Sequence, residues 1–201
     1  MTYLLATNNP AKVQEIRSIF SKHGLAFMSL SELGLYYEPS ETGETFEENA
    51  IQKATKTLAF LRENGHESIT VIADDSGLCI NAMGGLPGVD SANFMGRDTP
   101  YDIRNAHIIS KLIGSTDRGA RFVCVIACAY PNGKVITAEG EIHGQIAHSP
   151  AGVDGFGYDP IFYLPEYGQT SAQLPMHEKN RISHRGRALE AMIKIIQNHT
   201  C

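Results

Sequence analysis

Apolar and polar residues near the N-terminus follow the pattern of a strand, a turn and a helix. The apolar run at residues 3–6 predicts a short strand. Helical spacing follows at four apolar positions: Val13, Ile16, Ile19 and Phe20. Asn9 and Pro10 suit the N-cap and the first residue of that helix. A second strand is predicted between residues 25 and 30.

A longer helix is predicted to begin after Thr45 and to end at Gly65. Thr45 and Glu48 have the spacing of a capping box. The apolar side of this helix consists of Phe46, Ala50, Ala54, Leu58 and Leu61. A β-branched run at residues 70–73 then predicts a buried strand that ends in Asp74 and Asp75. Because strand residues alternate in direction, the two carboxylates should point to opposite faces of a sheet.

The second half of the chain predicts further helices and a hairpin. Asp98-Thr99-Pro100 has the features of a helix start, and the helix should continue from residue 103 to 113. Residues 121–130 and 134–141 read as two strands joined by a turn at 131–133. A last helix is predicted at residues 188–197.

The composition is that of an ordinary globular protein, with 42% hydrophobic and 19% charged residues. The net charge of −5 disfavours nucleic acid or an anionic membrane as the main partner. No apolar run is long enough to span a bilayer and no signal peptide is evident, so a cytoplasmic location is expected. The cysteines are expected to be reduced thiols, because their spacing suits neither a disulfide nor zinc: Cys79, Cys124, Cys128 and Cys201.

Two polar regions are candidates for binding a triphosphate and a metal. The predicted helix start at residues 9–12 presents free N–H groups and Lys12 to an anion, and Asn8 can occupy a left-handed turn position. The acidic strand end can supply oxygen ligands to Mg²⁺, joined by one or two of the glutamates at 38–48. An ordinary turn and a solvated acidic surface are the alternative interpretations.

A glycine-rich segment at residues 152–160 is a candidate for binding a planar base. Phe156 or Tyr158 can stack on a base, and Asp159 can accept a hydrogen bond from its edge. A tight turn whose aromatics fill the core explains the segment equally well. Lys179, His184 and Arg185 can serve phosphate or a base carbonyl, or can form the solvated start of a helix.

Taken together, six motifs resemble those of the inosine triphosphate pyrophosphatase family. In chain order they are Thr7-x-Asn9-x-x-Lys12, TFEENAIQKA at 45–54, ADDSGL at 73–78, GGLPG at 84–88, GFGYDPIF at 155–162 and SHRGRAL at 183–189. Each motif alone is weak, but their occurrence in this order is specific. The chain departs from the family at two places. Asn8 stands where many relatives have glycine, and Asn93-Phe94 stands where many bacterial relatives have arginine and tyrosine.

The resemblance implies an α/β fold and a single domain over residues 1–201. In that fold a long twisted mixed sheet with helices forms two lobes flanking a deep nucleotide-binding cleft. It also implies a homodimer, Mg²⁺ as cofactor, Glu41 and Asp75 as metal ligands, and Asp75 and Lys53 as catalytic residues. The implied substrate-binding residues are Thr7, Asn8, Asn9, Pro10, Ala11, Lys12, Lys53, Ser76, Phe156, Gly157, Tyr158, Asp159, Lys179, His184 and Arg185.

The expected reaction is Mg²⁺-dependent hydrolysis of ITP, dITP and XTP, by water attack at the α-phosphorus, to the monophosphate and pyrophosphate. It would cleanse the nucleotide pool of non-standard purines. Donors from His184 or Arg185 would favour the C6 carbonyl of hypoxanthine and xanthine over the amino group of adenine. The alternatives are a related pyrophosphatase that prefers pyrimidines or modified bases, and a nucleotide sensor that does not hydrolyse.

Overall fold

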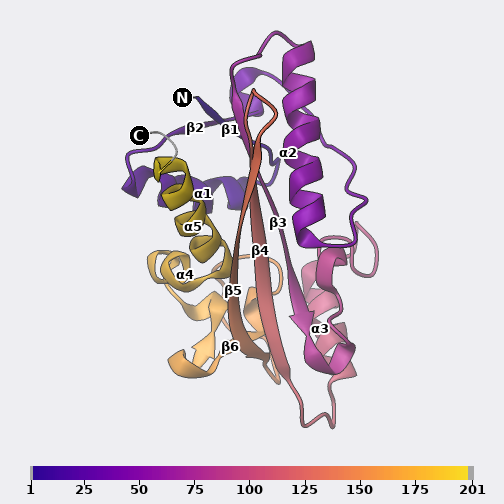
Figure 1. The fold of residues 1–201 in the computed structure, drawn as a ribbon. Coiled ribbons are helices and arrows are strands. Elements are labelled where there is room, and N and C mark those ends of the chain that lie inside the picture. The colour runs from indigo at the N-terminus through magenta and orange to yellow at the C-terminus, as the bar shows by residue number, and fades with distance from the viewer. Residues whose placement is uncertain (1, 199–201) are drawn as a thin grey trace. The chain divides into compact units, whose positions relative to one another are not determined.

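The computed structural model describes residues 2–198 of the chain. Its helices are α1 (Pro10–Lys22), α2 (Phe46–Glu63), α3 (Tyr101–Lys111), α4 (Met176–Ile182) and α5 (His184–Asn198). Its strands are β1 (Tyr3–Leu5), β2 (Phe27–Ser29), β3 (Thr70–Ile80), β4 (Gly119–Ala129), β5 (Val135–Ile146), β6 (Phe162–Leu164) and β7 (Gln169–Thr170) (Figure 1).

The strands form one seven-stranded sheet in the order β2-β1-β3-β4-β5-β6-β7. β1 pairs in parallel with β2 and β3, whereas β6 pairs antiparallel with β5 and β7. The predicted α/β class with a mixed sheet is therefore confirmed. The chain divides into two compact units whose boundaries fall within β3, β4 and β5 and after the first residue of α5. Of the described residues, the first unit holds 2–75, 124–140 and 185–198, and the second unit holds 76–123 and 141–184.

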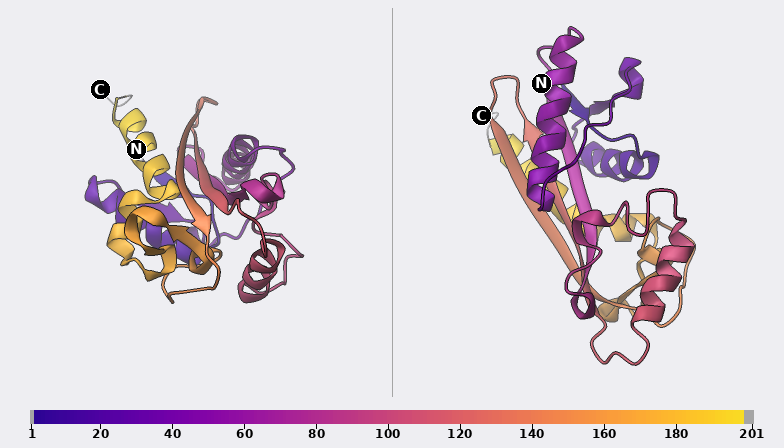
Figure 2. Two further views of the ribbon diagram at one scale, coloured as in Figure 1. Left: turned by 90° about the horizontal axis from the view of Figure 1, so that it is seen from below. Right: turned by 90° about the vertical axis from the view of Figure 1, so that its right-hand side faces the viewer.

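In the first unit, α1 and α5 lie on one side of the strands and α2 lies on the other (Figure 2). Ile72 packs in the core that α1 and α5 share, whereas its neighbours Val71 and Ala73 pack in the core under α2. This alternation continues along β3, so Asp74 follows the direction of Ile72 and Asp75 that of Ala73. The two carboxylates therefore point to opposite faces of the sheet, as predicted.

The structure corrects the predicted end of the acidic strand. β3 does not stop at Asp74 and Asp75 but continues to Ile80, so both acids lie in mid-strand. The reason is that apolar residues resume after Ser76 and Gly77. Leu78 and Ile80 are fully buried in the core of the second unit, and this burial keeps the chain extended beyond the acids.

Three other element predictions are refined. Glu48 donates its backbone N–H to the N-cap Thr45, but its carboxylate accepts from the backbone of Glu44 rather than from Thr45, so the capping box is only half formed. Residues 176–182 form a helix of their own, and α5 begins at His184 instead of residue 188. β5 is continuous to Ile146, which extends the predicted hairpin.

The thiols among the described residues are free, as expected: Cys79, Cys124 and Cys128. Burial raises the pKa of Cys124 to about 12, so this thiol is inert at neutral pH. Cys201 lies outside the described residues.

Candidate active site

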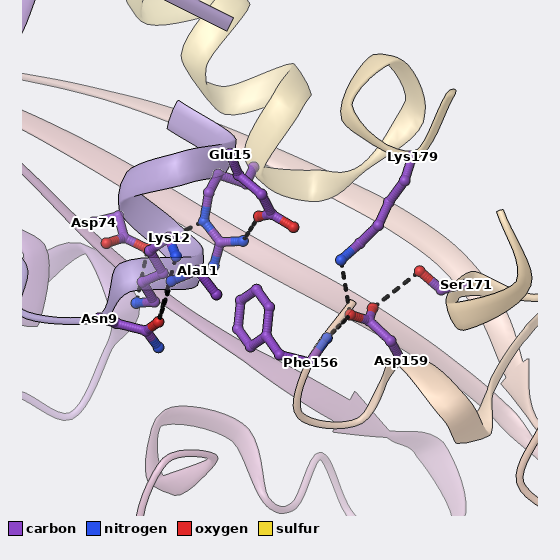
Figure 3. A network of polar contacts seen from close by, with 10 residues as sticks. Asn9, Ala11, Lys12, Glu15, Asp74, Phe156, Asp159, Ser171 and Lys179 are labelled. Atoms are coloured by element: carbon purple, nitrogen blue, oxygen red, sulfur yellow. Dashed lines mark hydrogen bonds and ion pairs between the residues drawn. The ribbon is translucent and has the colours of Figure 1, made fainter. Parts of the chain in front are cut away.

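The turn that leads from β1 into α1 is built by side-chain hydrogen bonds. Asn9 caps α1, and its Oδ1 accepts from the backbone N–H groups of Ala11 at 3.0 Å and Lys12 at 3.3 Å (Figure 3). Thr7 Oγ1 accepts from the Asn9 N–H at 3.2 Å. The predicted N-cap is confirmed, but the cap occupies two of the N–H groups that the sequence had suggested for phosphate.

Asn8 does not adopt the left-handed conformation that the sequence allowed. Among the non-glycine residues of the described chain, only Met95 has a positive φ. The Asn8 side chain donates instead to the carbonyl of Tyr37 at 3.2 Å. This hydrogen bond ties the turn to the loop that precedes α2. Pro10 occupies the first helical position, as predicted.

A buried ion-pair cluster centres on Asp74, whose side chain is fully buried. Its carboxylate lies 2.8 Å from Lys12 Nζ and 3.4 Å from Arg185 Nε. Arg185 Nη1 also pairs with Glu15 at 2.6 Å (Figure 3). Burial alone would raise the pKa of Asp74, but Lys12 and Arg185 outweigh burial and hold the pKa well below its usual range. Asp74 is therefore an anion that fixes two cations in place.

Asp75 and Lys53 form a second cluster in the first unit. Lys53 Nζ donates to the backbone carbonyl of Asp74 at 2.9 Å and pairs with Glu41 at 3.1 Å. Burial would lower the pKa of Lys53, but Asp74, Asp75 and Glu41 together raise it, so the side chain is a cation. Burial also raises the pKa of Asp75 to about 6, although Lys53 opposes this shift.

The two predicted metal ligands suit a hard cation. Asp75 Oδ2 is buried and has no hydrogen-bond partner among residues 2–198, which is a costly state for a carboxylate oxygen unless something binds to it. Glu41 forms an ion pair with the same Lys53, and its negative charge raises the pKa of Asp75. The two acids therefore repel one another. No group of three or more metal-ligating side chains exists among residues 2–198. A cation held here would complete its shell with water or phosphate oxygens, which is typical of Mg²⁺.

In the second unit, Asp159 is enclosed by protein donors. Its carboxylate accepts from Lys179 at 2.7 Å, from Ser171 Oγ at 2.9 Å and from the backbone N–H of Phe156 at 2.8 Å (Figure 3). Asp159 and Lys179 are buried, with 4% and 5% exposure. These bonds favour a role in shaping the 155–159 segment over the predicted direct contacts of Asp159 with a base and of Lys179 with phosphate.

Glycine is required at residue 155 for this enclosure. Gly155 has φ of +81°, and a Cβ there would lie 2.3 Å from Asp159 Oδ2. Neither the conformation nor the space admits a side chain. The segment is thus folded tightly around a buried carboxylate.

The two aromatics of this segment have different environments. Tyr158 is 4% exposed, donates its hydroxyl to the Ser91 carbonyl at 2.8 Å and packs edge-on against Tyr101. It belongs to the core, so the prediction that Tyr158 could stack on a base is not supported. Phe156 is only partly buried, with Lys179 Nζ 5.1 Å from its ring centre, and is the better stacking candidate.

The residues of the SHR motif fall in different settings. His184 is buried in the second unit, stacks on Phe122 at 4.7 Å between ring centres, and lines a cavity with Lys179 and Ser183. Arg185 belongs to the first unit and is engaged by Asp74 and Glu15. Sequence reasoning named Asp74 but not its pairing with Lys12 and Arg185, and it missed Glu15 and Phe122. The position of Glu15 three residues after Lys12 was a possible signal, but the contacts of Phe122 had none.

Comparison with known proteins decides the family. The model of the Ham1 family matches residues 3–195. This chain belongs to the Ham1 family. Proteins named dITP/XTP pyrophosphatase resemble it along nearly their whole length. The one from Desulforamulus reducens is 45% identical over 198 residues, which is 98% of this chain and 96% of that protein. The one from Bacillus subtilis is 42% identical over 196 residues, which is 96% of each.

Solved structures of Ham1 proteins share the fold. The Staphylococcus aureus Ham1 protein has a TM-score of 0.86 and 37% identity, with 99% of this chain and all of that one covered. A HAM1 protein from Coxiella burnetii has the same TM-score at 36% identity, with coverage of 98% and 99%. These matches confirm the resemblance that the six motifs predicted. None of the helices within residues 2–198 is long and apolar enough to cross a membrane. The cytoplasmic location, the homodimer and the absence of a nucleic-acid partner stay predictions.

Proposed function

We propose that this chain hydrolyses the non-standard purine triphosphates ITP, dITP and XTP to the monophosphate and pyrophosphate. The names of its Ham1-family relatives support the substrate class. The observation that carries the chemistry is Asp75, a buried carboxylate beside the Lys53–Glu41 pair. Its Oδ2 has no hydrogen-bond partner within the described part of the chain. Such a group is suited to a ligand of high positive charge density.

In this proposal Glu41 and Asp75 hold Mg²⁺. The bound cation would neutralise charge on the phosphate oxygens during the transfer. Burial of Asp75 favours cation binding, because the ionised carboxylate is poorly solvated before the ion arrives. Glu41 is more exposed than Asp75 and belongs to the loop that precedes α2.

Lys12 and Lys53 supply the fixed cations for the triphosphate. Lys12 sits in the first turn of α1, and Asp74 holds its ammonium within 2.8 Å. Lys53 is held by the backbone carbonyl of Asp74 and by Glu41. Two cations anchored from opposite faces of β3 can stabilise the negative charge that develops on the pyrophosphate leaving group. The positive end of α1 adds to this potential.

Asp75 is also the proposed proton acceptor for the attacking water. Its buried carboxylate lies beside Lys53 and would hold a water next to the bound cation. No covalent intermediate is proposed, because the described thiols are buried or have raised pKa values.

Base recognition is assigned to the second unit. Phe156 offers a partly exposed ring for stacking, and His184, which lines a cavity of that unit, offers a donor to a C6 carbonyl. Adenine presents a donor at that position, so an adenine there would leave a buried donor unpaired. Contacts of substrate with Thr7, Asn8, Ser76 and Gly157 are also part of the proposal.

The test is pyrophosphate release from ITP, XTP, GTP and ATP, each with and without Mg²⁺. The proposal expects release from ITP and XTP only with Mg²⁺, at a kcat/KM that exceeds that for ATP by at least about a hundredfold. Comparable rates for ATP would refute the recognition of the carbonyl edge. Preference for a pyrimidine triphosphate would favour the related pyrophosphatase, and tight ITP binding without pyrophosphate release would favour a sensor.

A further inference from the structure

The most unusual buried cation outside the clusters described above is Arg104 of α3 (Figure 1). Its side chain is 1% exposed. In the described chain its guanidinium donates to backbone carbonyls and not to a carboxylate. The acceptors are Ser91 at 3.3 Å, Ala92 at 2.7 Å, Gly96 at 2.9 Å and Arg97 at 3.1 Å. A buried cation without a counter-charge is costly unless the groups around it depend on it.

The loop that Arg104 holds has a strained conformation. Met95, inside the loop, has φ of 65°, which is unusual for a residue with a side chain. Arg104 grips carbonyls on both sides of Met95, and Thr99 Oγ1 donates to the Met95 carbonyl itself at 2.7 Å. The loop is therefore held by Arg104 of α3 in addition to hydrogen bonds of its own.

The same loop is bonded to the glycine-rich segment. The carbonyl of Ser91 accepts from both Arg104 Nη1 and the hydroxyl of Tyr158. The next residue of α3, Asn105, donates from Nδ2 to the Gly157 carbonyl at 3.1 Å. Tyr101 of α3 packs against the Tyr158 ring, with 5.2 Å between ring centres.

α3 therefore contacts two adjacent residues of the glycine-rich segment, Gly157 and Tyr158. Gly157 has φ of +69°, so its peptide planes are set by a conformation that few residues adopt. Phe156 precedes Gly157 directly in the chain, so the position of its Cα depends on where the backbone at 157 is held. A loss of the α3 contacts would release Phe156 without touching it.

We infer that Arg104 and Asn105 are positioning residues that set the selectivity for the nucleobase by fixing the segment 155–159. The inference rests on the proposed hydrolysis of ITP and deepens it, because it assigns base selectivity to a helix that need not contact the substrate. Neither residue belongs to a motif that suggested the function.

The first experiment measures position and needs no activity. The chain contains eight tyrosines but no tryptophan, so Phe156→Trp creates a single tryptophan reporter that can be excited selectively. In that background we expect Asn105→Ala to increase the acrylamide quenching constant by about twofold, because local order at the reporter is lost. Ser110→Ala is the matched control, since it removes a hydroxyl on the exposed side of α3 that bonds within the helix. Equal quenching in the Asn105 and Ser110 variants would overturn the inference.

The second experiment measures selectivity in the native Phe156 background. We expect Asn105→Ala and Arg104→Lys to lower the ratio of kcat/KM for ITP over ATP by about tenfold, because the recognising groups lose their alignment. Lysine keeps the charge of Arg104 but cannot reach several carbonyls at once. Competitive inhibition by tripolyphosphate, which has no base, should change by less than about twofold in these variants, because the phosphate-binding groups are untouched.

The outcomes separate the two proposals. If KM for ITP and the inhibition constant of tripolyphosphate rise in proportion, the effect is general destabilisation and the inference is wrong. An unchanged ITP/ATP ratio in both variants also overturns it while leaving ITP hydrolysis intact. If the wild-type protein fails to hydrolyse ITP, the proposed function falls, and the quenching experiment still decides whether α3 positions the segment.

Discussion

The substitution Asp75→Asn should make the protein more stable while abolishing its activity. Burial raises the pKa of Asp75 from 3.8 to about 6, and the side chain is only 7% exposed. A shift of this size corresponds to about 3 kcal/mol by which the ionised carboxylate lowers the free energy of unfolding. Asparagine has nearly the same shape and carries no charge, so it removes this penalty.

The sign of the pH dependence is fixed by the raised pKa. Above about pH 6 the carboxylate is ionised in both the folded and the unfolded state, and the folded state bears the full penalty. Below about pH 4 both states are protonated and the penalty is absent. The variant should therefore be more stable than wild type near neutral pH, and the difference should vanish as the pH falls through this window.

The assay is urea unfolding and thermal melting in EDTA, since a bound cation would stabilise the ionised carboxylate. A gain of about 3 kcal/mol corresponds to about 6–12 °C in Tm for a chain of this size. Asp98→Asn, at an exposed aspartate, is the control for the loss of one negative charge and should change stability by less than about 0.5 kcal/mol. A destabilised Asp75→Asn variant, or a gain that persists at low pH, would refute the reasoning.

Three further substitutions test other parts of the site. Asp74→Asn should lower the free energy of unfolding by about 3 kcal/mol, because it breaks a buried ion pair. Since the pKa of Asp74 is lowered, this loss should be full above about pH 4 and smaller in more acid solution, which urea unfolding across pH will measure. Glu41→Gln should raise the Mg²⁺ concentration for half-maximal pyrophosphate release by at least about tenfold, whereas the nearby exposed Glu44→Gln should not; equal Mg²⁺ dependence would remove Glu41 from the metal site. Phe156→Ala should raise KM for ITP by about tenfold and Phe156→Tyr should preserve it, and an unchanged KM in the alanine variant would exclude stacking.

Local features of the fold were predictable from the sequence because they depend on neighbouring residues. Asn9 caps α1, and the alternation along residues 70–75 sends the two acids to opposite faces. The end of β3 was not predictable in this way, because the burial of Leu78 and Ile80 depends on residues far away in sequence.

The sequence predicted which residues are candidates for the site, but not which of them pair with one another. Motifs identified Lys12, Arg185 and Asp159 as polar residues of interest, but not their partners. Asp74 is 111 residues from Arg185, and Asp159 is 20 residues from Lys179. Which cation pairs with which carboxylate follows from the assembled sheet and helices. The sequence therefore suggested direct substrate contacts for groups that the structure shows bonded to protein.

The central claim is tested most directly by the products of a single turnover of ITP with Mg²⁺ in water enriched in ¹⁸O. The account predicts IMP and pyrophosphate in equal amounts, with the ¹⁸O label in the phosphate of IMP, and no product from Asp75→Asn on the same timescale. Formation of IDP and orthophosphate, or label in pyrophosphate instead of IMP, would contradict attack at the α-phosphorus.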